Sequence, residues 1–267
     1  MATIETAPGR STNYDITGPE GAPVVLLIAG LGAPRRFWEP NIDVFAREFL
    51  VVTIDNRDAG ENEPDTAAYS MADMADDAVN LLKALDVERA HIVGISMGGF
   101  ISQHLAIRHP EVVDRLVLVG TGPAAGAALG NPLPPPTDAD WIEDPSERTR
   151  LRSPHNVAPG YYDTRPEELE AQGERYRGNG ITRDGYARQV AAISDTHDVR
   201  ERLKDISAPT LVVHGEVDPT VPLRGGELIA QGVPGARLLV YPGVGHLPPH
   251  EVTEQFNHDV LAFLKET

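Results

Sequence analysis

The sequence predicts a doubly wound α/β fold with a mostly parallel sheet that is interrupted once by inserted helices. Short apolar runs recur along the chain, and each ends at a glycine or a polar turn. The runs are continuous rather than alternating, which is typical of strands covered on both faces in a parallel sheet. Helical patterns lie between several of these runs, and this alternation of strands and helices indicates a doubly wound sheet.

The predicted strands alternate with predicted helices along the chain. The strands are VVLLIAG from Val24, LVVTID from Leu50, HIVGI from His91, RLVLVG from Arg115, TLVVHG from Thr210 and RLLVYPG from Arg237. From Met71 to Leu85 the apolar residues recur at a helical period and leave aspartates for the solvent face. Residues 98–109 and 252–264 also predict helices, and the first of these ends before Pro110.

The alternation stops between residues 122 and 206. This interval opens with GPAAGAALGNPLPPPTDAD, which is too rich in proline and glycine for a regular element. It continues with RPEELEAQGERYRG and TRDGYARQVAAISDTHDVRERL, which predict helices. We therefore expect a core of residues 1–121 and 207–267, with residues 122–206 inserted as a helical cap or lid. Such an insertion would lie at the carboxyl ends of the strands, where open α/β sheets bind ligands. The alternative is a surface excursion without a role at the site.

Length, composition and charge limit the classes of function. With 267 residues and 41% hydrophobic content, the chain is long enough for one large domain with a substantial core. Its 23 basic and 40 acidic residues give a net charge of −17, so a nucleic-acid backbone or an anionic membrane would be repelled. The absence of cysteine excludes disulfides, thiolate metal sites and a cysteine nucleophile. Neither a signal peptide nor a membrane-spanning run is recognisable, and we expect a cytoplasmic protein.

The segment HIVGISMGGF contains the pattern G-x-S-x-G, with Ser96 between Gly94 and Gly98. A strand is predicted before it and a helix after it, which is the context that this nucleophile motif requires. Glycines allow a sharply bent, strained backbone to hold the serine hydroxyl out toward a substrate. The Met97 N–H, at the start of the helix, would then help to stabilise an oxyanion. A tight turn without catalysis is the alternative interpretation.

A serine hydroxyl is a weak nucleophile, so catalysis also requires a base and a group that orients the base. His246 follows the last predicted strand in YPGVGHLPP, and Asp218 follows the preceding strand in VVHGEVDPTVP. Both therefore lie at the same edge of the sheet as Ser96. The order Ser, Asp, His along the chain is the order expected for a nucleophile elbow on an α/β sheet. His250 is a second choice for the base, and Thr121 stands where some variants carry the acid.

The second oxyanion donor is expected in the turn after the first core strand, LLIAGLGAP. The backbone N–H of Leu31, which follows Gly30, is the best placed candidate. Backbone donors leave no mark on side-chain identity, so only the position of the turn supports this assignment.

The motifs GISMGG, HGEVDPTVP and GVGHLPP, together with the inserted cap, resemble the α/β-hydrolase superfamily. The resemblance runs from about Asp15 to the end of the chain. More narrowly, LLIAGLG, TIDNRDAGEN and YARQVAAI are similar to aclacinomycin methylesterase and related small esterases. The resemblance implies an α/β-hydrolase fold with Ser96 as nucleophile, His246 as general base, Asp218 as its partner, and the Leu31 and Met97 amides as oxyanion hole.

The chain departs from that group at two places. Ala29-Gly30 stands where many relatives have His-Gly, and Asn62 stands where the group often has serine. Neither position belongs to the proposed triad, but both lie near the expected pocket edge. For the neighbouring NRD sequence we expect a structural role, with Arg57 paired to a carboxylate.

The expected activity is hydrolysis of a small-molecule carboxylic ester through an acyl-enzyme, with no cofactor and no metal. A cofactor-free haloperoxidase or perhydrolase, a lactonase and a carbon–carbon bond hydrolase use related constellations and stay open. A ligand-binding protein on a degenerate fold is a further alternative. Nothing in the sequence selects an oligomeric state. Aromatic residues of the insertion would line the pocket or anchor the cap, namely Trp141, Tyr161, Tyr162, Tyr176 and Tyr186.

Overall fold

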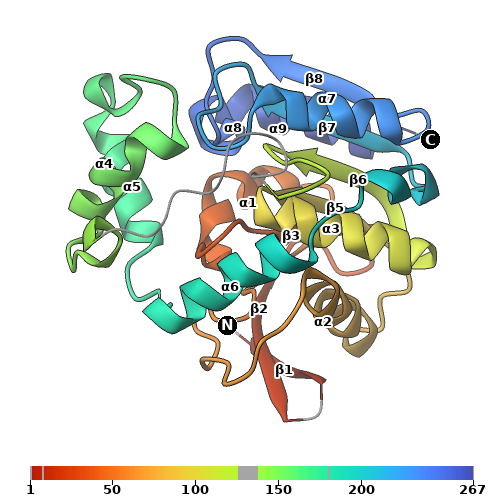
Figure 1. Cartoon of the computed structure of the whole chain (residues 1–267). Helices are drawn as coiled ribbons and strands as arrows, with labels where there is room; N and C mark the ends of the chain where they lie inside the picture. Colours follow the sequence, from red (N-terminus) through yellow and green to blue (C-terminus); the bar gives the residue numbers. More distant parts are fainter. Residues whose placement is uncertain (1, 8, 126–137, 180, 267) are drawn as a thin grey trace.

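A computed structural model describes residues 2–7, 9–125, 138–179 and 181–266, which form a twisted sheet with helices on both faces (Figure 1). The strand order is β1-β2-β4-β3-β5-β6-β7-β8. Strands β3 to β8 run parallel, whereas β1 and β2 pair antiparallel at one edge. The strands are β1 Ala2–Ala7, β2 Arg10–Thr17, β3 Val24–Ile28, β4 Leu50–Ile54, β5 Ala90–Ile95, β6 Val113–Val119, β7 Thr210–Gly215 and β8 Arg237–Tyr241.

Helices cover the two faces of the sheet. The first face carries α2, α3 and α7, and the second carries α1 and α9. The α-helices outside the insertion are α1 Glu39–Phe45, α2 Met71–Ala84, α3 Met97–Arg108, α7 Leu223–Gly232, α8 Pro248–Glu251 and α9 Thr253–Leu264. Short 3₁₀ turns are η1 Arg35–Trp38, η2 Pro110–Val112 and η6 Arg200–Asp205. The predicted doubly wound α/β fold is confirmed.

The central strands are apolar throughout because both of their faces are buried. In β3, Leu26 and Ile28 face the cluster formed with α2 and α3, whereas Val25 and Leu27 face the cluster formed with α1 and α9. All four side chains are inaccessible to solvent. Burying each one stabilises the fold by about 1.5–3 kcal/mol. Continuous apolar runs in the sequence were therefore the correct signal for these strands.

The antiparallel hairpin of β1 and β2 is not among the strands predicted above. Its sequences, ATIETA and RSTNYDIT, are largely polar and partly exposed, so they carry no apolar run. The hairpin is held instead by strand pairing and by polar contacts such as Thr6 Oγ1 to Thr12 Oγ1, 2.9 Å apart. Pairing of β2 with β4 then joins the hairpin to the sheet.

Helix α2 begins where its sequence predicts. The Ser70 side chain accepts a hydrogen bond from the Asp73 N–H, and the Asp73 carboxylate accepts one from the Ser70 N–H. This reciprocal capping satisfies two of the otherwise unpaired N–H groups of the first turn. Met71, Met74 and Leu82 lie on the buried side of the helix, in agreement with the helical period of the apolar residues.

The chain between β6 and β7 forms helices α4 Pro145–Asn156, α5 Pro166–Arg175 and α6 Arg183–Thr196, with short turns η4 Asp138–Trp141 and η5 Tyr162–Thr164. In Figure 1, α4 and α5 lie together at one side of the molecule and α6 runs from them toward α2. The two ends of this segment meet, because Ala124 bridges to Asp198 and the Val199 N–H donates to the Pro123 oxygen over 2.8 Å. Most of the proline-rich stretch predicted to be irregular, at 126–137, lies outside the described residues.

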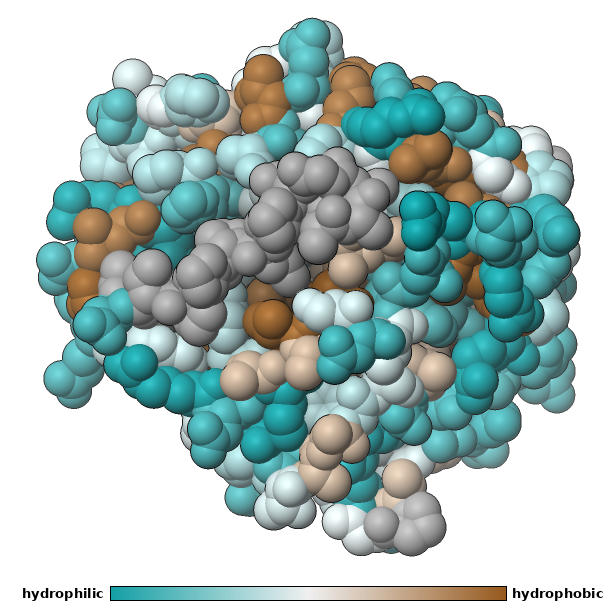
Figure 2. Space-filling view, in the orientation of Figure 1, coloured by the Kyte–Doolittle hydropathy of each residue, from teal (hydrophilic) through white to brown (hydrophobic). Residues whose placement is uncertain are grey.

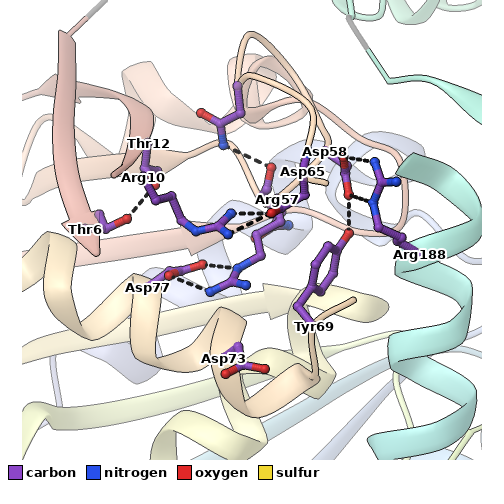
Figure 3. A network of polar contacts seen from close by, with 12 residues as sticks. Thr6, Arg10, Thr12, Arg57, Asp58, Asp65, Tyr69, Asp73, Asp77 and Arg188 are labelled. Atoms are coloured by element: carbon purple, nitrogen blue, oxygen red, sulfur yellow. Dashed lines mark hydrogen bonds and ion pairs between the residues drawn. The ribbon is translucent and has the colours of Figure 1, made fainter. Parts of the chain in front are cut away.

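Ion pairs fix the loop that follows β4 (Figure 3). Arg57 donates to Asp77 of α2 through Nε, over 2.5 Å, and through Nη2, over 3.0 Å, which confirms the expected pairing of Arg57 with a carboxylate. Asp58 accepts two hydrogen bonds from Arg188 of α6 and one from the Tyr69 hydroxyl. The loop is thereby tied to helices on either side of it.

Asn62, one of the departures from the resembled group, also has a structural role. Its Oδ1 accepts from the Asn13 N–H of β2 over 2.8 Å, and its Nδ2 donates to the Asp55 oxygen over 2.8 Å. A serine is too short to make both contacts at once. Asn62 therefore holds the loop after β4 against the edge hairpin.

Hydrophilic residues dominate the face seen in Figure 2, in keeping with the excess of acidic residues. The large hydrophobic side chains exposed on the described surface are scattered, namely Ile16, Leu151, Val217 and Leu238. None of the helices in the described ranges combines the length and the apolar character that crossing a membrane requires.

Candidate active site

Ser96 stands in a strained turn between β5 and α3. Its backbone has φ +54° and ψ −118°, a region that costs a non-glycine residue of order 1–3 kcal/mol. The neighbouring glycines make the turn possible. A Cβ at Gly98 would overlap the Ile28 carbonyl oxygen, and a Cβ at Gly94 would overlap the Gly98 carbonyl oxygen. The G-x-S-x-G pattern thus reflects close packing of strand, turn and helix.

Hydrogen bonds with the last residue of β6 and with Thr121, just beyond that strand, hold this turn. The Ser96 N–H donates to the Val119 oxygen over 2.9 Å, and Thr121 Oγ1 donates to the Ser96 oxygen over 2.9 Å. Thr121, which occupies the place where an acid could have stood, therefore fixes the backbone of Ser96.

His246 and Asp218 meet at the same edge of the sheet. His246 Nδ1 lies 2.8 Å from Asp218 Oδ2, and the Asp218 carboxylate is inaccessible to solvent. Asp218 Oδ1 accepts hydrogen bonds from the N–H groups of Thr220 and Val221, each over 2.8 Å. These backbone donors fix the carboxylate, so that Oδ2 is directed at the imidazole.

Ser96 and His246 line one cavity of about 130 Å³, and Asp218 lies behind His246. The structure thus brings together the serine, the histidine and the aspartate that the sequence predicted for this edge. Leu31 also lines the cavity. Further lining residues include Gly30, Phe37, His155, Tyr162, Tyr176 and Tyr186.

Two backbone N–H groups adjoin the serine. Within the described part of the chain, neither the Leu31 N–H nor the Met97 N–H has a hydrogen-bond acceptor. Met97 opens α3, where the first N–H groups of a helix lack intrahelical partners. Gly30 brings the other loop close, because a Cβ there would lie 3.3 Å from the Ser96 Cβ. Both predicted oxyanion donors are therefore positioned beside the serine turn with their N–H groups available.

Glu251 supports the His246 loop and was missed in the sequence. Its Oε2 accepts from the N–H groups of Gly245, over 3.0 Å, and Ala158, over 2.8 Å, and its Oε1 accepts from the Leu247 N–H over 3.0 Å. Burial raises the pKa of this carboxyl group. An acidic residue that follows the histidine loop so closely, in LPPHEV, is the signal that could have identified it.

The aromatic residues of the insertion divide into two groups. Tyr162, Tyr176 and Tyr186 line the cavity. Tyr161 donates to the His250 oxygen over 3.0 Å, and Trp141 packs edge-on against Tyr186 with the ring centres 5.9 Å apart. Both expected roles of these aromatic residues therefore occur: some line the pocket and others anchor the cap.

Three other histidines, His250, His214 and His91, do not line the cavity. His250 Nε2 lies 2.8 Å from the Phe37 oxygen, and burial lowers the pKa of His250 to about 3. His214 lies beneath the aspartate loop, where its Nε2 is 2.9 Å from the Val221 oxygen and burial lowers its pKa. His91, in β5, is buried as well. Among the described residues, no group of three or more histidine and acidic side chains is arranged to hold a metal ion.

Acid is expected to destabilise the fold through His197 and His250. Burial lowers the pKa of each to about 3, against an ordinary value of 6.5, so below pH 6.5 the unfolded chain binds more protons than the folded chain. The contribution of these two histidines to the free energy of unfolding is complete above pH 6.5. It is lost as the pH falls toward 3, by about 1.4 kcal/mol per pH unit for each histidine.

Urea unfolding between about pH 7 and pH 5 measures this slope, because most carboxylates stay ionised in that range. His197→Gln should reduce the slope, whereas His258→Gln, which alters an exposed histidine, should leave it unchanged. An equal slope in His197→Gln and wild type would contradict the assignment.

Known proteins resemble this chain in sequence and in structure along nearly its whole length. A family model described as the alpha/beta hydrolase fold matches residues 23–251. The chain is 31% identical to "Putative carbamate hydrolase RutD" of Serratia proteamaculans, over 95% of this chain and 96% of that protein. It is 27% identical to 3-oxoadipate enol-lactonase 2 of Acinetobacter baylyi, over 97% and 95%. The crystal structure of a hydrolase from Pseudomonas aeruginosa superposes with a TM-score of 0.85 at 30% identity, over 99% and 98%.

Proposed function

The chain belongs to the alpha/beta hydrolase fold family, and on that premise we propose that it is a serine hydrolase that cleaves carboxylic esters. The observation that carries the proposal is the strained Ser96 turn sharing one cavity with His246, whose Nδ1 lies 2.8 Å from the buried Asp218 carboxylate. Residues 1–121 and 207–267 supply these side chains, and residues 122–206 act as a cap over them.

In the first half of the reaction, Ser96 Oγ attacks the ester carbonyl while His246 Nε2 takes its proton. The carbonyl electron pair becomes an oxyanion, which accepts hydrogen bonds from the Leu31 and Met97 N–H groups. Asp218 holds the proton on His246 Nδ1, so that Nε2 is free to act as the base, and stabilises the imidazolium that forms. The tetrahedral intermediate then collapses, and the alcohol leaves with the proton from His246.

In the second half, water attacks the acyl-enzyme with His246 again as the base, and the acid leaves as Ser96 regains its proton. These steps use groups of this chain and water. The cavity of about 130 Å³ is small beside typical ligand sites, which supports a substrate with a short acyl chain. We place the protein in the cytoplasm, acting on a small molecule.

A lactonase is the second candidate, because the chain resembles an enol-lactonase along almost its whole length. A lactone is a cyclic ester, so the same acyl-enzyme steps would open it. The likeness to a protein named as a carbamate hydrolase adds carbamates to the substrates to be compared. The narrower assignment to the aclacinomycin methylesterase group remains a prediction. Rates on a matched methyl ester, lactone and carbamate would rank these classes, and peroxide-dependent bromination would identify a perhydrolase.

The proposal predicts an acyl-enzyme on Ser96. Rapid mixing with p-nitrophenyl acetate should release a burst of one p-nitrophenolate per protein before steady turnover. Acid quenching followed by mass spectrometry should locate the acetyl group on the peptide that contains Ser96. The octanoate ester should react more slowly, because the cavity is small. Steady turnover with the acetyl group on another residue would contradict the proposal.

A further inference from the structure

Two amide side chains from the segment between β6 and β7 hold both backbone groups of Gly32. The Gly32 N–H donates to Gln189 Oε1 over 2.8 Å, and Asn179 Nδ2 donates to the Gly32 oxygen over 2.6 Å. Gly32 follows Leu31 directly and has φ +67°, a conformation that glycine adopts readily but does not strongly prefer. Within the turn the Ala33 N–H donates to the Gly30 oxygen over 3.2 Å, and the two amide side chains add contacts from elsewhere that fix Gly32.

The same two amides reach a second loop, the one that follows β4. Gln189 Nε2 donates to the Arg57 oxygen over 2.6 Å, and Asn179 Oδ1 accepts from the Gly60 N–H over 2.7 Å. Each amide thus uses its donor and its acceptor to bridge residues 57–60 to Gly32. We call these four hydrogen bonds the Gly32 clamp.

Gln189 is fully buried, with 0% of its surface exposed. A buried amide is costly unless its polar atoms are paired, and both polar atoms of this side chain are. A leucine of similar size would fill the same space without that requirement. The identity of the side chain is therefore explained by its hydrogen bonds to the two loops.

Helix α6 approaches the loop after β4 closely enough to make the clamp precise. A Cβ at Gly185 would lie 2.8 Å from the Asp58 Cβ, so only glycine permits this separation. One turn further on, Arg188 binds Asp58 through Nε, over 2.9 Å, and Nη2, over 2.7 Å (Figure 3). Arg188 anchors the same helix to the same loop without a hydrogen bond to Gly32.

We propose that Gln189 and Asn179 are positioning residues that hold the Leu31 N–H in the orientation needed to stabilise the oxyanion. This inference rests on the proposed esterase function. The Gly32 N–H is occupied by Gln189, so Leu31 supplies the donor on this side of the serine. The clamp joins two residues of the cap to the loop that carries the Leu31 N–H, so these two amide side chains, rather than the docking of α6 as a whole, set the position of that donor.

Gln189→Leu is expected to lower kcat for p-nitrophenyl acetate by about 100-fold with KM changed less than about threefold, since a misplaced oxyanion donor weakens the transition state alone. A trifluoromethyl ketone tests the same donors. Ser96 Oγ bonds to the ketone carbon, its proton passes to His246, and the carbonyl electron pair becomes an oxyanion. The affinity of the protein for this ketone should fall in parallel with kcat. Gln189→Glu, which keeps an acceptor for the Gly32 N–H, should lie between Gln189→Leu and wild type.

Arg188→Gln is the matched control, because it weakens the docking of α6 and leaves the clamp intact. Its kcat should remain within about threefold of wild type, since no donor to the oxyanion depends on it. Asn179→Ala gives a second test at a half-buried position, where folding is less at risk. It should lower kcat about 10-fold with KM unchanged, as expected for partial loss of donor alignment. Amide hydrogen exchange at Gly32 should become faster in Gln189→Leu but not in Arg188→Gln.

The inference is overturned if Asn179→Ala, and Gln189→Leu where it folds, retain kcat and ketone affinity. It is also overturned if Arg188→Gln loses as much as they do, because general loosening of α6 would then explain the effect. The proposed function fails on a different observation, which is ester turnover that survives in Ser96→Ala. Exchange at Gly32 reports on the clamp whether or not an ester is turned over.

Discussion

Replacing Ser96 with alanine is expected to lower kcat for p-nitrophenyl acetate by about 10⁶-fold, the loss that follows removal of a catalytic serine from a comparable triad. Without Oγ no acyl-enzyme forms, and His246 can only promote direct attack by water. The alanine fits the turn, since it retains the Cβ that already occupies this site. Spectrophotometric assay of p-nitrophenolate release measures the loss, and a burst should be absent.

Ser102→Ala is the matched control for that substitution. Ser102 lies on α3 and is fully buried, and its hydroxyl donates to the Gly98 oxygen over 2.7 Å without lining the cavity. Its loss should cost about 1 kcal/mol of stability and leave kcat nearly unchanged. Ester turnover in Ser96→Ala close to that in Ser102→Ala would exclude Ser96 as the nucleophile.

Asp218→Asn is expected to lower kcat by about 10⁴-fold through the tautomer of His246. The Thr220 and Val221 N–H groups donate to Oδ1, so the amide oxygen of asparagine would take that place. The amide NH₂ would then face His246 Nδ1, which must become an acceptor. The imidazole proton would move to Nε2, and Nε2 could no longer accept the proton of Ser96.

The size of this loss should be measured with the same ester and compared with Glu216→Gln. Glu216 lies on the same loop, is exposed, and accepts a hydrogen bond from the Gly243 N–H over 3.0 Å. Its neutralisation should leave kcat within about twofold, because the side chain has no contact with the imidazole. A loss in Asp218→Asn no larger than in Glu216→Gln would show that the histidine is oriented by another group.

The parts of the fold that the sequence predicted are those that rest on local signals. The central strands are apolar along their length because both faces are covered, and the apolar residues of α2 recur at a helical period. The β1–β2 hairpin could not be found in this way. Its polar residues are stabilised by pairing with a distant strand, β4, and no local pattern reports such a partner.

The candidate site was predictable to a similar extent. Ser96, Asp218 and His246 follow predicted strands, so the edge at which they meet could be inferred before their distances were known. Glu251 binds the nearby Gly245 and Leu247 N–H groups, so an acidic residue in that loop was a usable local signal. Gln189 had no such signal, because it acts on backbone groups that are remote in the chain. Gln189 is 157 residues from the glycine that it holds. Only the folded structure shows which backbone N–H groups would lack a partner if such a side chain were removed.

The meeting of the two ends of the inserted segment, at Ala124 and Asp198, also bears on how new specificities arise in such a scaffold. A segment whose ends are adjacent can be lengthened, shortened or exchanged as one unit while the strands on either side keep their places. The entropy of closing a loop grows only slowly with its length, so such changes cost little stability. Recombination could therefore transplant this unit between paralogues, provided that the graft again supplies an amide partner for the turn at Gly32.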